Sequence, residues 1–267
     1  MVLRTAINQF LRRPVPLWEP ELTTLLVRER ERIPDRYELP VAGRWPLGMP
    51  GGDRIIWLEA PVMNPISSFY GEHGLSPLGA TDLIAADCQS KLTGALELLG
   101  QVNGTLRAVS QLLNSIQVLK SDDEEIDVSY SHPEILSAIF VSVCRDLTPL
   151  SHIRVAESIL HESMHLKLTL IEQTVPLVKP DTGNRYYSPW RDEPRLARGV
   201  MHGLFVFRAI FDFFRAFAGP ARASIKDHLD FRQEQIIDEF RQLDQFDRCP
   251  DLTQEGAILI KSLLPLS

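Results

Sequence analysis

Cysteine is scarce in this chain, which excludes the scaffolds that depend on it. The 267 residues include three cysteines at widely separated positions, Cys88, Cys144 and Cys249. The odd number and the wide spacing exclude a disulfide framework and a Cys-x-x-Cys zinc site. Free cysteine is among the most often buried residue types, so we expect three reduced, structural thiols.

Long apolar runs and an excess of basic residues are also missing. No stretch approaches the roughly 18 apolar residues that indicate a membrane span. The first residues lack the continuous apolar segment and the small-residue cleavage site of a signal peptide. The formal net charge is −7 and the isoelectric point is about 5.5, whereas a general nucleic-acid binder carries a basic face. We therefore expect a cytoplasmic protein that binds neither membranes nor nucleic acids.

The composition that is present is typical of a globular protein, with 44% hydrophobic and 24% charged residues. Apolar residues recur mainly at helical spacing, which predicts a mainly α fold with a minor β-sheet, an α+β class. The predicted helices are 2–13, 19–33, 81–100, 104–119, 150–174, 195–217, 221–244 and 253–264. The predicted strands are 54–58, 126–130 and 138–144.

Proline and glycine set the first part of the chain apart from the rest. They are concentrated in residues 34–80, which predicts loops there. We expect residues 1–80 to form a loop-rich N-terminal region and residues 81–267 to form a mainly helical domain. No linker is visible between the two, so we expect one continuous globular unit.

One helical segment carries the strongest chemical signal, the pattern HExxH in residues 161–165. His161 and His165 are four residues apart, so they project from one face of a helix and can both reach one metal ion. Glu162 can border the open coordination position, which makes it the candidate catalytic residue. We expect this helix, residues 150–174, to pack against a C-terminal helical bundle.

Two histidines do not complete a catalytic metal site, which usually has a third protein ligand. His202 lies in the next predicted helix, and we expect it to be this ligand. The glycines at 199 and 203 would let two helices approach closely there. The competing ligands are Glu172, Asp192 and Glu193.

Three arginines, Arg191, Arg195 and Arg198, cluster between the HExxH segment and His202. Arginine stays charged and binds carboxylates through two parallel hydrogen bonds. The cluster therefore indicates a ligand that carries a carboxylate. Ion pairing with nearby acidic residues is the alternative for each arginine, and we expect at least one of the three to bind an anion.

Three segments of the chain together resemble a known family. They are residues 155–165 (VAESILHESMH), 187–195 (YSPWRDEPR) and 199–207 (GVMHGLFVF). They are similar to the HExxH-motif proteins found with ribosomally made peptide natural products, a family regarded as iron- and 2-oxoglutarate-dependent peptide β-hydroxylases. Leu196 departs from the family, which tends to have proline there, and we expect this to affect the shape of the loop. Many metallopeptidases share HExxH, so the other two segments make the resemblance specific.

The resemblance implies a site and a reaction. His161 and His165 would bind Fe(II), with His202 as the third ligand by position, and the three arginines would be candidates to bind a carboxylate of 2-oxoglutarate. The protein would hydroxylate the β-carbon of a residue in a precursor peptide. Glu162 would then orient a ligand or a water. Residues 1–80 lie outside the resemblance and are the candidate peptide-binding region.

Two other functions stay open from the residues. In a zinc metallopeptidase, Glu162 would be the general base that activates a zinc-bound water. In a non-catalytic peptide-binding protein, the metal site would be structural or vestigial. The resemblance and the arginines favour the oxygenase, while the choice between iron and zinc stays open because imidazole suits both metals.

Overall fold

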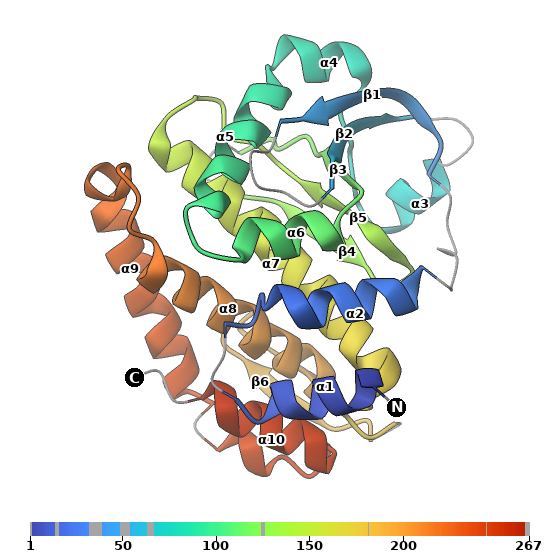
Figure 1. Cartoon of the computed structure of the whole chain (residues 1–267), viewed down its shortest axis with the longest axis vertical. Helices are drawn as coiled ribbons and strands as arrows, with labels where there is room; N and C mark the ends of the chain where they lie inside the picture. The colour runs from blue at the N-terminus through green and yellow to red at the C-terminus, as the bar shows by residue number, and fades with distance from the viewer. Residues whose placement is uncertain are drawn as a thin grey trace.

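The structure, a computed structural model, describes residues 2–13, 16–31, 39–48, 54–62, 67–123, 126–180, 182–243 and 245–264. It combines a five-stranded sheet with a larger number of helices (Figure 1). The predicted α+β class with a minor sheet is therefore confirmed. Among the described residues, no helix has the length and apolar character needed to cross a membrane.

The sheet has the strand order β1-β2-β3-β5-β4. Its strands are β1 (Val41–Leu47), β2 (Ile56–Pro61), β3 (Ser115–Val118), β4 (Ser129–His132) and β5 (Ile135–Val141). The inner strands β2, β3 and β5 are parallel, and the outer strands β1 and β4 are antiparallel to their neighbours. The β4–β5 pairing places Ser129 opposite Val141 and Ser131 opposite Ile139. Because β4 is last in the strand order, it is an edge strand.

The helix α7 (Pro149–Thr174) runs through the middle of the molecule (Figure 1). It packs against α5 (Cys88–Gly100), α8 (Ala197–Ala216) and α9 (Arg222–Arg241), and it contacts β4 and β5. The prediction that the HExxH helix packs on C-terminal helices is confirmed.

The other elements are α1 (Val2–Leu11), α2 (Pro20–Arg30), α3 (Ser67–Glu72), α4 (Ala80–Ala85), α6 (Thr105–Leu112), the hairpin β6 (Arg185–Ser188) and β7 (Glu193–Leu196), a 3₁₀ turn (Phe246–Arg248) and α10 (Gln254–Leu263).

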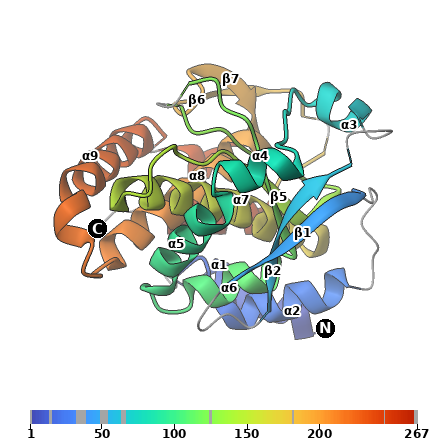
Figure 2. The same ribbon diagram turned by 90° about the horizontal axis from the view of Figure 1, so that it is seen from above.

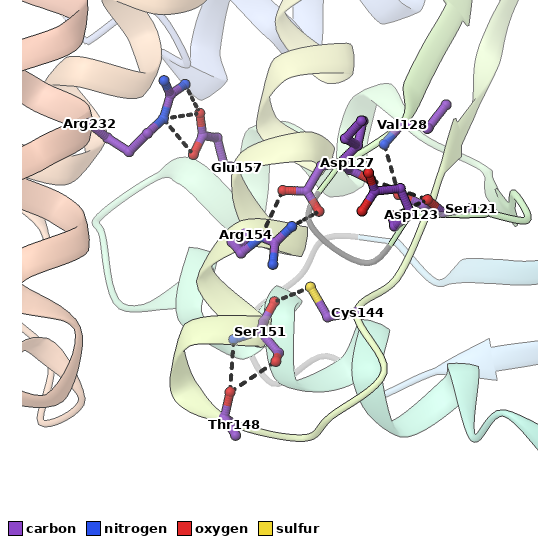
Figure 3. A network of polar contacts seen from close by, with 12 residues as sticks. Ser121, Asp123, Asp127, Val128, Cys144, Thr148, Ser151, Arg154, Glu157 and Arg232 are labelled. Atoms are coloured by element: carbon purple, nitrogen blue, oxygen red, sulfur yellow. Dashed lines mark hydrogen bonds and ion pairs between the residues drawn. The ribbon is translucent and has the colours of Figure 1, made fainter.

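Local sequence also explains where α7 begins. Pro149 occupies the first turn, where its fixed φ and missing N–H are tolerated. The hydroxyl of Thr148 accepts a hydrogen bond from the Ser151 N–H at 3.1 Å and caps the helix (Figure 3). The predicted bounds of 150–174 are nearly correct for this reason.

Two predicted helices are wrong in part. The helix predicted over 104–119 ends at Leu112, and Ser115–Val118 form the fully buried strand β3 between two parallel strands. Strands buried on both faces read as continuous apolar runs, which periodicity does not separate from a helix. The helix predicted over 81–100 is divided into α4 and α5 at Asp87, whose φ is 49°.

The sheet is larger than predicted. The strand predicted at 54–58 is β2, but the sequence analysis missed β1, because Gly43 and Pro46 argue against a strand. Proline is tolerated in β1 because the strand lies at the edge of the sheet. The loop predicted between α7 and α8 contains the β6–β7 hairpin, which lies over α8 (Figure 2).

All three cysteines are free thiols. Burial raises the pKa of Cys88 to about 11, so its thiol is protonated and unreactive at neutral pH. This agrees with the structural role predicted for it.

A buried lysine connects α7 to the N-terminal helices. Lys167 has no exposed surface. Its ammonium donates a hydrogen bond to the carbonyl oxygen of Glu19 at 3.0 Å and lies 5.1 Å from the centre of the Phe10 ring. Burial lowers the pKa of Lys167 to about 7.

The stability of the Lys167→Met variant should therefore depend on pH differently from that of the wild type. The folded pKa lies below the unfolded value of about 10.4, so between these values the unfolded chain binds more protons. The free energy of unfolding of the wild type then rises with pH relative to the variant. Urea unfolding at about pH 7 and about pH 9 should show the difference. If the free energies of unfolding of the wild type and the variant differ by the same amount at both pH values, the lowered pKa of Lys167 is contradicted.

Candidate metal centre

The two histidines of the HExxH segment lie side by side on α7. Their Nε2 atoms are 3.1 Å apart. Two nitrogens bound to one ion at about 2.0–2.1 Å would lie about 2.9 Å apart at a right angle and about 3.3 Å apart at the tetrahedral angle. The observed separation lies between these limits, so His161 and His165 fit a shared metal ion.

Burial keeps both imidazoles neutral. The pKa of His161 is lowered to about 4, mainly by burial and then by the charges of Arg191 and Arg232. Burial also lowers the pKa of His165 well below its usual value, and the neighbouring His161 adds to this. The neutral ring is the form that binds a metal. Because 24% of the His161 side chain is exposed, the pair can be reached from solvent.

Glu162 is held by the edge strand β4. Its two carboxylate oxygens accept hydrogen bonds from the hydroxyls of Ser129 and Ser131, each at 2.6 Å. The two serines point to the same side because they are two residues apart on a strand. Oε1 of Glu162 lies 3.8 Å from Nε2 of His161. Neither serine was predicted as a site residue, although Ser129 lies on the predicted strand 126–130 and Ser131 directly follows it.

His202 approaches the histidine pair from α8. Its Nδ1 lies 3.1 Å from Nδ1 of His165, and the two rings are stacked. Its Nε2 lies 2.8 Å from Oε2 of Glu172, which also accepts a hydrogen bond from Nε of Arg198 at 2.9 Å. Because Nε2 of His165 faces His161, His202 contacts the opposite nitrogen of the ring. In these positions His202 orients His165.

The side chains, as they are placed, do not form a complete set of metal ligands. Among the residues that the structure describes, no group of three or more His, Cys, Asp and Glu side chains is arranged to hold a metal ion. The roles of His161 and His165 as metal ligands, and of His202 as a third, stay predictions. The competing ligands have other contacts: Glu172 binds His202, Asp192 accepts a hydrogen bond from Tyr187, and Glu193 lies near Arg195.

The three arginines have different environments. Arg198 pairs with Glu172, and Nε of Arg195 lies 3.8 Å from a carboxylate oxygen of Glu193. The charge of Arg191 instead lowers the pKa of both histidines on α7. Within the described parts of the chain, no carboxylate pairs with its guanidinium. Arg191 is therefore the best-placed of the three to bind an anion beside the histidines.

Trp190 fixes the segment that carries Arg191. Its ring is stacked on Phe207, with the centroids 5.2 Å apart, and Phe207 in turn contacts His161. Trp190 also lies against Gly203, where an added Cβ would be 2.4 Å from the ring. The expectation that this glycine allows a close approach of two helices is thus corrected, because the space takes the tryptophan.

Ion pairs border the site on the side of α9. Glu157, one helical turn before His161, binds Arg232, whose Nε lies 3.1 Å from its carboxylate (Figure 3). Arg154 holds Asp127 through two hydrogen bonds of 2.9 and 3.0 Å. These pairs connect α7 to α9 and to the segment before β4, and so fix the surroundings of His161.

No protein-family model and no curated protein matches the sequence. The family resemblance therefore stays a prediction.

Proposed function

We propose that the protein is a cytoplasmic Fe(II)- and 2-oxoglutarate-dependent oxygenase that hydroxylates the β-carbon of a residue in a ribosomally made precursor peptide. The observation that carries the proposal is that Arg191, an exposed arginine, lies near enough to His161 and His165 for its charge to lower the pKa of both rings. Among the described residues no carboxylate neutralises it. A guanidinium in this position suits a co-substrate that carries a carboxylate, which hydrolysis of a peptide bond does not require.

The reaction would balance as follows. One oxygen atom of O₂ enters a C–H bond of the peptide as a hydroxyl group, and the other enters succinate, which forms from 2-oxoglutarate with loss of CO₂. Iron, when bound, supplies the activation of O₂. His161 and His165 would hold it, and Arg191 would bind a carboxylate of 2-oxoglutarate. Phe207, against His161, and Trp190, stacked on Phe207, would form an apolar wall on one side of His161.

The first test does not need the peptide. Anaerobic protein with Fe(II) and 2-oxoglutarate should develop the visible charge-transfer absorption of an iron–keto acid complex, and the His161→Ala variant should not. After oxygen is admitted, succinate should form, and faster when a precursor peptide that is a substrate is added. Tight zinc binding without this absorption or succinate would overturn the proposal.

A zinc metallopeptidase is the second candidate, because the Glu162 carboxylate lies 3.8 Å from Nε2 of His161. The Glu162→Gln variant separates the two functions. Glutamine can still form hydrogen bonds with Ser129 and Ser131, so the oxygenase should keep its absorption with Fe(II) and 2-oxoglutarate. A peptidase would instead lose its general base, and peptide cleavage would fall by about 10²–10⁴-fold.

A further inference from the structure

The edge strand beside Glu162 has backbone groups that face outward. The Ser142 N–H donates to the carbonyl of Val128 at 2.7 Å, and the Val128 N–H donates to the hydroxyl of Ser142 at 2.8 Å, so the backbones of Val128 and Ser142 face each other next to β4. The backbone N–H and C=O groups of successive residues in an antiparallel strand point alternately toward the partner strand and away from it. The groups of Tyr130 therefore point toward β5, and those of Ser129 and Ser131 point away from the sheet. In the described parts of the chain, no backbone group meets them from outside. All of β4 stays partly exposed.

This outer edge adjoins the histidine pair. The hydroxyl of Ser129 is 2.6 Å from Oε1 of Glu162, and that oxygen is 3.8 Å from Nε2 of His161. A neighbouring strand would lie about 4.7–4.9 Å from β4. A chain in this position would therefore pass near Glu162 and His161.

A groove continues from the end of β4. Its volume is about 770 Å³, within the range of about 300–1,000 Å³ that is typical of ligand sites. Its lining includes Pro133, the residue after β4, Thr169 and Glu172 of α7, and Leu196 and Arg198 at the start of α8. An extended chain that leaves the β4 edge at this end would enter the groove.

We propose that an extended segment of the peptide substrate adds to β4 as a sixth strand, along the outward backbone groups of Ser129 and Ser131, and continues into this groove. The inference rests on the proposed function in taking the substrate to be a peptide. Main-chain hydrogen bonds to Ser129 and Ser131 would supply affinity that does not depend on the side chains. Alternate side chains would face α7, so the register of the added strand selects the residue presented to the histidines. This differs from the expectation that residues 1–80 bind the peptide.

Amide hydrogen exchange of the full chain, without metal, 2-oxoglutarate or oxygen, tests the proposal. The probe is a synthetic library of octapeptides with random sequence, and its matched control is the same library N-methylated at every amide. At about 90% occupancy the unmodified library should slow exchange of the Ser129 and Ser131 amides about tenfold. The N-methylated library should have no effect, and β1, the opposite edge strand, should not change with either.

Three outcomes would overturn the proposal. They are equal protection by both libraries, no protection at saturating peptide, and protection that grows with protein concentration when no peptide is present. The last result would indicate that a second copy of the chain occupies the edge.

A pair of variants isolates the backbone contribution. Ser129→Ala and Ser129→Pro both remove the hydroxyl that binds Glu162, but the proline also removes the outward N–H. Proline is tolerated on edge strands, and melting curves check that both variants fold. The Ser131 amide should stay protected by the peptide library in the alanine variant and lose this protection in the proline variant. Equal protection in both would contradict strand addition.

The test of strand addition and the test of the oxygenase function can fail independently. Protection of β4 without succinate formation would leave strand addition standing and overturn the oxygenase. Succinate formation that depends on the precursor peptide, without protection of β4, would do the reverse.

Discussion

Replacement of Arg191 by alanine should raise the KM for 2-oxoglutarate by about 100-fold, corresponding to about 3 kcal/mol. The guanidinium lies close enough to the histidine pair to lower the pKa of both rings. A bound carboxylate would therefore gain two charge-assisted hydrogen bonds that alanine cannot supply. The contact is the same before and during the reaction, so kcat at saturating 2-oxoglutarate should fall much less than kcat/KM. Initial rates of succinate formation measure both parameters.

The matched control is Arg195→Ala in the same segment. Arg195 is partly exposed and lies 3.8 Å from Glu193, an ion pair of a kind that contributes little. Its KM for 2-oxoglutarate should stay within about twofold of the wild type. Arg191→Lys should give an intermediate value, because lysine keeps the charge but loses the planar fork. A large rise in KM for Arg195→Ala with none for Arg191→Ala would assign the carboxylate to Arg195.

The part of the site that could be predicted from the sequence is the part that one helix determines. A spacing of four residues places His161 and His165 next to each other on any α-helix, independently of the surrounding packing. The structure places their Nε2 atoms 3.1 Å apart. The bounds of α7 were also predictable, because Pro149 and the capping Thr148 are local signals.

The rest of the site depends on contacts between distant segments. Ser129 and Ser131 reach Glu162 from 33 and 31 residues away. Their role requires the pairing of β4 with β5, which single-sequence periodicity does not determine. The choice of Arg191 among three arginines likewise depends on where Glu172 and Glu193 lie in space. Strand β3 was missed for the same reason, since its burial comes from strands far away in the sequence.

Replacement of His161 and of His202 by alanine should affect iron binding to very different extents. His161→Ala removes one of the two nitrogens that face each other, so the protein should not bind Fe(II) measurably. His202 contacts the far nitrogen of His165, and it is held in turn by Glu172. Its loss should free the His165 ring to rotate and weaken Fe(II) binding by about 10–100-fold, as is usual for partners that orient a ligand. Anaerobic Fe(II) titration measures both effects.

The Glu172→Gln variant is the matched test of this chain of contacts. Glutamine keeps a hydrogen-bonding group beside His202 but removes the negative charge, so its effect should be smaller than that of His202→Ala and in the same direction. If His202→Ala abolishes iron binding as completely as His161→Ala, His202 is the third ligand that the sequence predicts, and its ring must turn toward the ion when iron binds.

If His161→Ala keeps full biological activity, the metal has no catalytic role. That result would support the non-catalytic peptide-binding function and count against the oxygenase.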